Sequence, residues 1–281
     1  MAGAALVLGG GGITGAAWEI GVLAGLHAAG VDLTSADAVI GTSAGAIVGA
    51  QILSGVPIDE LYSKQFRNPI GEVATQVPIS TLARFLIWML IPGDERQVRA
   101  RIGGAALRAR TMHESERIRV ISGRLHVKTW PQRDLRITAI DAESGEFVVF
   151  KHDSGVDLVD AVAASCAVPL VYPPVTIGGR RYIDGGMRSA ANADLAAGFD
   201  AIVALTPVSV RLRRSRSAEG QIDSLGKGIR SLVVKADAHA RKAMGTQPLD
   251  PAFRAPSARA GWAQATSVAR AVEEVWASVR A

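Results

Sequence analysis

The sequence has a single cysteine, few aromatic residues and no long apolar run. One cysteine among 281 residues cannot form an internal disulfide, which is typical of a protein from a reducing compartment. Aromatic residues make up 5% of the chain, too few for surfaces on which nucleic-acid bases stack, so we expect no nucleic-acid partner. The most apolar stretch, Phe85 to Ile91, is far shorter than the roughly 20 residues that a membrane-spanning helix needs.

The N-terminus lacks the features of a secretion signal. It has no basic segment and no cleavage site before Gly9, so we expect a cytoplasmic protein. The net charge is +5, and several basic residues cluster late in the chain: Arg211, Arg213, Arg214, Arg216, Lys227, Arg230, Lys235, Arg241 and Lys242. Two interpretations fit this cluster, a solvated face or a peripheral contact with anionic lipids at the inner face of the membrane.

Short apolar runs alternate with helical patterns, and the 48% hydrophobic content is ample for a core. We predict strands at 4–9, 38–40, 135–140, 146–150, 171–177, 181–183 and 201–205, and helices at 16–29, 44–53, 159–167 and 257–279. The alternation predicts an α/β fold, a three-layer α/β/α sandwich with a mostly parallel central sheet.

No linker is long enough to separate two domains, so we predict one domain over residues 1–281. Residues 58–110 show no clear strand and mixed helical signals, which favours a helical cap or lid inserted into this domain. Within it, the apolar side chains of Thr81 to Pro92 fit either an interfacial lid for acyl chains or the core of the cap.

A G-x-S-x-G motif stands where a predicted strand ends and a helix begins. It consists of Gly41, Ser43 and Gly45 with Thr42 and Ala44 between them. At such an elbow the serine hydroxyl stands clear of the chain at a helix N-terminus, where the Ala44 amide favours a developing negative charge. The alternative is that Ser43 only caps the helix, which is a frequent role of serine.

A glycine loop, Gly10-Gly11-Gly12-Ile13-Thr14-Gly15, follows the first predicted strand. It fits a dinucleotide fingerprint, or an oxyanion hole built from exposed amides. A dinucleotide site needs an acidic residue at the end of the second strand, and that place holds the elbow of Ser43. The spacing therefore favours the oxyanion hole.

Three motifs in order, the glycine loop, the Gly41–Gly45 elbow and Asp184-Gly185-Gly186, make the sequence from about Leu6 to Asp194 resemble the patatin-like phospholipases. The segment Ala163 to Pro169 is similar to one that usually precedes the aspartate motif in this family. The single cysteine, Cys166, lies in this apolar segment, and we interpret it as a buried structural residue rather than a catalytic thiol.

The resemblance implies a Ser-Asp dyad without histidine, in which Ser43 attacks an ester carbonyl of a lipid or acyl-ester substrate and Asp184 accepts its proton. It implies an oxyanion hole formed by Gly10, Gly11, Gly12 and Ala44, with Gly15, Gly41, Gly45, Gly185 and Gly186 shaping the turns. It implies an acyl-enzyme intermediate and neither a metal nor an organic cofactor.

The sequence departs from the family at Thr14, where Arg or Lys often stands. This departure raises the hypothesis that a less charged ester is as suitable a substrate as a phospholipid. Three other function classes stay open: a Ser-His-Asp esterase using His239, a non-catalytic lipid-binding protein and a nucleotide-binding protein. The sequence makes no prediction of the oligomeric state.

Overall fold

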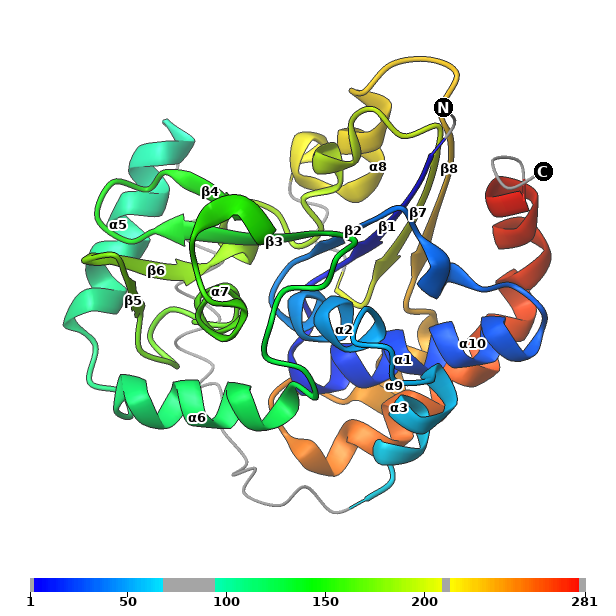
Figure 1. Cartoon of the computed structure of the whole chain (residues 1–281), viewed down its shortest axis with the longest axis horizontal. Helices are drawn as coiled ribbons and strands as arrows, with labels where there is room; N and C mark the ends of the chain where they lie inside the picture. Colours follow the sequence, from blue (N-terminus) through cyan, green and yellow to red (C-terminus); the bar gives the residue numbers. More distant parts are fainter. Residues whose placement is uncertain (1–2, 68–93, 209–212, 278–281) are drawn as a thin grey trace.

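The computed structural model describes residues 3–67, 94–208 and 213–277. Its centre is one sheet (Figure 1), in the strand order β5-β6-β3-β2-β1-β7-β8 with β4 paired to β3. Five strands are parallel, β1 (Ala4–Leu8), β2 (Ala38–Gly41), β3 (Asp134–Asp141), β7 (Ala201–Thr206) and β8 (Arg230–Lys235). Strands β4 (Phe147–Phe150) and β6 (Arg180–Asp184) run antiparallel to β3, and β5 (Val175–Ile177) runs antiparallel to β6.

Alternating side chains of the strands bury both faces of this sheet, as the period of two in a strand requires. In β1, Leu6 and Leu8 join the larger core, while Ala5 and Val7 join the smaller one. The larger core includes side chains of α1 (Gly12–Ala28), α2 (Ala44–Ile52), α7 (Leu158–Ser165) and α10 (Arg254–Trp276). On the other side lie α8 (Ala218–Asp223) and α5 (Glu95–Arg108), so the predicted three-layer α/β/α fold is confirmed.

The predicted cap is described only at its two ends. Helix α3 (Ile58–Lys64) packs against α1, and α5 packs against β3 and β6 through Val98, Ile102 and Ala106. The predicted lid, Thr81 to Pro92, lies outside the described residues. The cap and the single domain therefore stay predictions.

Four described helices and strands have no counterpart in the sequence-based expectations, and one of them is α8. Helix α6 (Glu114–Arg124) packs against α7, α9 (Ala238–Met244) packs against α10, and β8 forms one edge of the sheet. Strand β8 escapes prediction because its outer residues are exposed and its sequence, Arg-Ser-Leu-Val-Val-Lys, does not alternate cleanly.

One edge of β3 is shared by two strands that arrive from opposite directions. Gly41, the last residue of β2, pairs with Ile137, and Asp184, the last residue of β6, pairs with Ala139. Because β4 pairs with both Ile137 and Ala139 on the opposite edge, β2 and β6 must share the same edge. Two residues of a strand span about 7 Å, so β3 brings the ends of β2 and β6 close together.

Helix α1, which begins at the glycine loop, is fixed by unusually close packing against α10. A Cβ atom added to Gly21 would lie 2.1 Å from the carbonyl oxygen of Ala258, and one added to Gly261 would lie 2.2 Å from that of Trp18. Neither glycine can gain a side chain unless the two helices separate.

We expect Gly261→Ala to lower the free energy of unfolding by about 1–3 kcal/mol, because the added methyl group forces α1 and α10 apart. Gly123→Ala in α6 is the matched control, since nothing lies within 4 Å of its added Cβ, and helix propensity favours alanine by up to about 1 kcal/mol. Urea unfolding measures both. Equal effects of the two substitutions would contradict this account of the helix contact.

Candidate active site

Ser43 lies at a strained turn between β2 and α2. Its backbone has φ 53° and ψ −112°, a left-handed conformation that costs a non-glycine residue on the order of 1–3 kcal/mol. A Cβ atom on Gly45 would lie 2.0 Å from the carbonyl oxygen of Leu8, and one on Gly41 would lie 2.6 Å from Cα of Ala46. The two glycines let the turn close around the strained Ser43.

The C-terminal end of α7 holds this turn through two hydrogen bonds. The backbone amide of Ser43 donates to Oγ of Ser165 at 2.9 Å, and the thiol of Cys166 donates to the carbonyl oxygen of Ser43 at 3.2 Å. Burial raises the pKa of Cys166 to about 12, so the thiol is neutral and unreactive near neutral pH. Ser165 was not predicted as a site residue, although it lies in the family-like segment.

Asp184 reaches Ser43 from β6, along the shared edge of β3. Its side chain is buried, and Oδ1 accepts a hydrogen bond from the Gly186 amide at 2.8 Å. The Ser43 side chain is near enough to this carboxylate to lower its pKa. The residue after it, Gly185, is so close to β3 that an added Cβ would lie 2.2 Å from Oγ1 of Thr138.

Burial raises the pKa of Asp184 to about 6, because desolvation disfavours the charged carboxylate. Three weaker influences oppose this rise: the hydrogen bonds from Ser43 and from the Gly186 amide, and the positive charge of Arg117. Asp184 is therefore a stronger base than an exposed aspartate, yet it is mostly ionised near neutral pH.

The glycine loop lies beside the Ser43 turn. The amide of Gly45 donates to the carbonyl oxygen of Gly9 at 3.1 Å, which joins the two segments directly. Gly12 has a φ of 66°, and the Gly15 amide closes the first turn of α1 by donating to Gly11 at 2.9 Å.

Only part of the predicted set of oxyanion donors is free. The Gly10 amide donates to the carbonyl oxygen of Ala190 at 2.8 Å, so this N–H already has a partner within the chain. The amides of Gly11, Gly12 and Ala44 have no hydrogen-bond partner among the described residues. These three N–H groups are available to donate hydrogen bonds to an oxyanion.

A family model described as patatin-like phospholipase matches residues 6–197, which covers all three motifs and most of the sheet. This chain belongs to the patatin-like phospholipase family. No curated protein matches the chain at a significant level.

Two solved structures are distantly similar to this patatin-like chain. VipD from Legionella pneumophila shares 13% identity with a TM-score of 0.47, over 96% of this chain and 67% of VipD. The type III effector protein ExoU shares 17% identity with a TM-score of 0.40, over 95% of this chain. The matched region is 53% of the ExoU chain, so this patatin-like chain spans about half of that protein.

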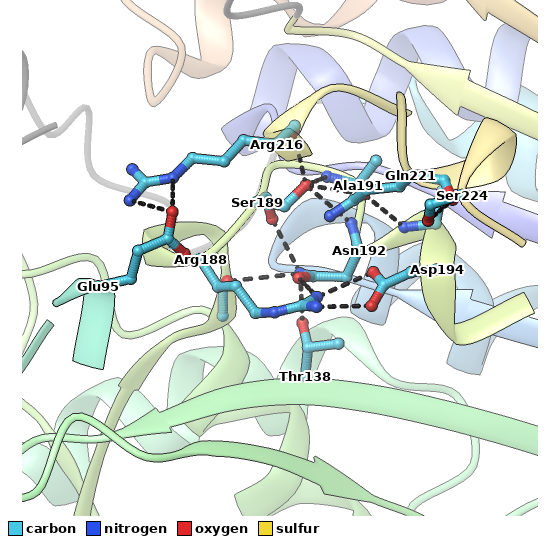
Figure 2. Close-up of polar contacts among 12 residues, drawn as sticks. Glu95, Thr138, Arg188, Ser189, Ala191, Asn192, Asp194, Arg216, Gln221 and Ser224 are labelled. Atoms are coloured by element: carbon cyan, nitrogen blue, oxygen red, sulfur yellow. Dashed lines mark hydrogen bonds and ion pairs between the residues drawn. The ribbon is translucent and has the colours of Figure 1, made fainter. Parts of the chain in front are cut away.

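Asn192 is a buried residue that the sequence analysis missed and that contacts segments on both sides of the site. Its side-chain amide donates to Oγ1 of Thr42 at 3.0 Å and to the carbonyl oxygen of Gly185 at 3.4 Å. It also donates to Oγ1 of Thr138 at 3.4 Å (Figure 2). Thr138 also donates to Thr42 at 3.0 Å. Since Thr42 precedes Ser43 and Gly185 follows Asp184, Asn192 ties the two candidate residues to one point on β3.

A wider polar network holds Asn192 in its own left-handed conformation, with φ 51°. Arg188 donates to Oδ1 of Asn192 at 2.8 Å and pairs with Asp194. Oγ of Ser189 accepts the Asn192 amide at 3.1 Å and contacts Gln221 of α8 at 3.2 Å. The only sequence signal for these residues is their position shortly after the Asp184 motif.

Histidines and metal ligands do not gather at this site. All five histidines, His27, His113, His126, His152 and His239, lie in the described residues and are exposed, whereas Asp184 is buried. In the described ranges no group of three or more His, Cys, Asp or Glu residues is placed to hold a metal ion.

The buried charge of Asp184 opposes folding of this patatin-like protein, so we expect Asp184→Asn to be more stable at about pH 8. Burial raises the pKa of Asp184 from the ordinary value of about 4 to about 6, so the stabilising contribution of this group falls as pH rises between these two values. The gain at about pH 8 should be on the order of 1–3 kcal/mol and should disappear near pH 4, where the native carboxyl is neutral.

Thermal or urea unfolding of both proteins at the two pH values measures this difference. Asp153→Asn, which changes an exposed carboxylate, serves as the control and should shift stability by less than about 0.5 kcal/mol. An Asp184→Asn variant that is no more stable at the higher pH would show that the carboxylate is not desolvated.

Proposed function

We propose that this patatin-like protein is a serine acyl hydrolase that cleaves carboxylic esters of lipids, with Ser43 as nucleophile and Asp184 as its base. One observation carries the proposal. The strained Ser43 lies near enough to the buried Asp184 carboxylate to lower its pKa, beside backbone amides without partners among the described residues. Membership of the family supports lipid esters as the substrate class.

In this proposal, Ser43 Oγ attacks the ester carbonyl carbon while its proton passes to Asp184. The carbonyl oxygen becomes an oxyanion and accepts hydrogen bonds from the amides of Gly11, Gly12 and Ala44. Collapse of the intermediate breaks the bond to the alcohol, which takes the proton from Asp184. Water then attacks the acyl-enzyme and gives one proton to Asp184. Collapse of this second intermediate releases the fatty acid, and Asp184 returns the proton to Ser43 Oγ.

The pKa of Asp184 suits both directions of this proton transfer. An aspartate with a pKa near 4 is a weak base for a hydroxyl, and one with a pKa far above 7 would carry its proton before the reaction starts. A value of about 6 leaves the carboxylate ionised near neutral pH and still increases its basicity.

The other function classes find less support. A Ser-His-Asp esterase needs a histidine that contacts the Ser43 hydroxyl, whereas His239 is exposed on α9. A dinucleotide site needs an acidic residue after β2, where Ser43 stands. A binding protein without turnover has no use for a strained serine next to a buried carboxylate.

In this proposal, any contact between the protein and a membrane is peripheral. Among the described helices, none combines the length and the apolar character that crossing a bilayer requires. The basic cluster is partly neutralised, because Arg213 and Arg216 pair with Glu95, and Arg214 pairs with Asp223. These ion pairs favour the interpretation as a solvated face over a lipid-binding patch.

A fluorophosphonate probe tests the nucleophile. We expect it to label Ser43, and we expect Ser43→Ala to abolish labelling and to lower ester hydrolysis by at least about 10³-fold, because no other side chain can form the acyl-enzyme. Mass spectrometry locates the label, and fatty-acid release from a lipid panel measures activity. The control is Ser115→Ala, an exposed serine on α6, which should leave both readouts unchanged. Labelling at any other residue would refute the assignment.

The pH profile tests the base. We expect kcat/KM to rise with pH through about 6 and to level off above about pH 7, because only ionised Asp184 accepts the Ser43 proton. Asp184→Asn should lose nearly all activity at every pH while keeping its fold. A flat profile across this range would exclude Asp184 as the titrating base.

A further inference from the structure

Helix α6 buries an arginine that forms no direct ion pair within the described part of the chain. Arg117 is 4% exposed, its Nε is buried without a hydrogen-bond partner, and among the described residues it forms no ion pair. Its guanidinium carbon lies 3.5 Å from the centre of the Tyr172 ring, which is a cation–π contact. A buried charge without a partner is costly, so an anion from outside the chain would stabilise this position.

Arg117 lies on the side of the active site that faces α6. Its charge acts on Cys166 and on Asp184, and the thiol of Cys166 contacts the carbonyl oxygen of Ser43. Tyr172, on which Arg117 stacks, clusters with Leu249, and a Cβ added to Gly12 would lie 3.0 Å from Cδ2 of Leu249. One continuous wall therefore joins Arg117 to the amides of the glycine loop.

Apart from Arg117, this wall consists of the Tyr172 ring and aliphatic side chains. Val168 and Val171 complete the cluster around Tyr172 and Leu249. The glycine loop, residues 9–15, carries no basic side chain, and the Thr14 hydroxyl is buried without a partner among the described residues. Any positive charge that meets the substrate beside the glycine loop must come from another element, and Arg117 of α6 supplies one.

A guanidinium matches phosphate, because its planar fork donates two parallel hydrogen bonds to neighbouring oxygens. In a glycerophospholipid or its lyso form, the phosphate lies a few bonds from the ester that is cleaved. An apolar wall with one arginine thus complements an acyl chain and an adjacent phosphate.

We propose that Arg117 binds the phosphate group of the ester substrate and makes the enzyme prefer phosphorylated acyl esters over uncharged ones. The proposal rests on the proposed function of Ser43. It assigns to α6 the cationic group that Thr14 cannot provide, and it opposes the hypothesis of a less charged substrate.

Two substrates that differ only in the phosphate test the proposal: 1-oleoyl lysophosphatidic acid and 1-oleoylglycerol. We expect Arg117→Met to lower kcat/KM for the phosphorylated ester by about 10- to 100-fold more than for the neutral one, because a charge-assisted pair is lost. Assays are run at about pH 8, where Asp184 is ionised in both proteins, so that its pKa does not affect the ratio.

Arg119→Met is the matched control, because it removes the same charge from an exposed position of the same helix and should leave the ratio unchanged. Arg117→Lys keeps the charge without the planar fork, and we expect an intermediate ratio with a melting temperature close to that of the wild type. This variant also decides the matter if Arg117→Met does not fold.

An unchanged ratio in both Arg117 variants would overturn the proposal, whether the two rates fall together or not at all. Inorganic phosphate could also inhibit hydrolysis of both substrates while the ratio of their kcat/KM values stays unchanged in the Arg117 variants. That result would identify a site for a free anion and would equally overturn the proposal. If the wild type cleaves neither substrate and the fluorophosphonate does not label Ser43, the proposed function fails together with this inference.

Discussion

The site depends on the pairing of β3 with two strands along a single edge. Strand β2 ends at Gly41 opposite Ile137, and β6 ends at Asp184 opposite Ala139, so two segments that are far apart in the sequence meet head-on. The register of a buried sheet is strongly specified, because a slip by one residue would turn every side chain to the other face. The pairing with β3 therefore fixes where β2 and β6 meet. Ser43 follows the end of β2 by two residues, so its turn lies next to the Asp184 carboxylate at the end of β6.

This meeting point brings together features that each oppose folding. Ser43 has a strained backbone, and Asp184 carries a charge out of water. Neither would persist in a loosely held loop, because each could relax by moving about an ångström. The side chain of Asn192 prevents that movement by binding Thr42, Thr138 and Gly185 at once. The hydrogen bonds of Asn192 thus offset the free-energy cost of the strained Ser43 backbone and of the buried Asp184 charge.

The two residues of the proposed dyad stand out in the sequence because each sits in a tight turn that only particular residues allow. Glycines at 41, 45 and 185 mark such turns, and they point to Ser43 and Asp184. Residues that support the site from other elements leave no such mark. Asn192, Ser165 and Arg117 matter through contacts between distant segments, which spacing does not reveal. The use of the Gly10 amide by Ala190 is likewise a tertiary contact.

Arg117 and Asp184 are both buried, yet they do not form an ion pair, and this separation has a chemical reason in the proposed mechanism. A direct guanidinium contact would lower the pKa of the aspartate by about 1–3 units and would weaken it as a base for Ser43. Stacking on Tyr172 holds the cation back, so it stabilises the carboxylate only weakly. The guanidinium thereby remains free to bind an anion that the substrate brings, while the aspartate keeps the basicity that its burial creates.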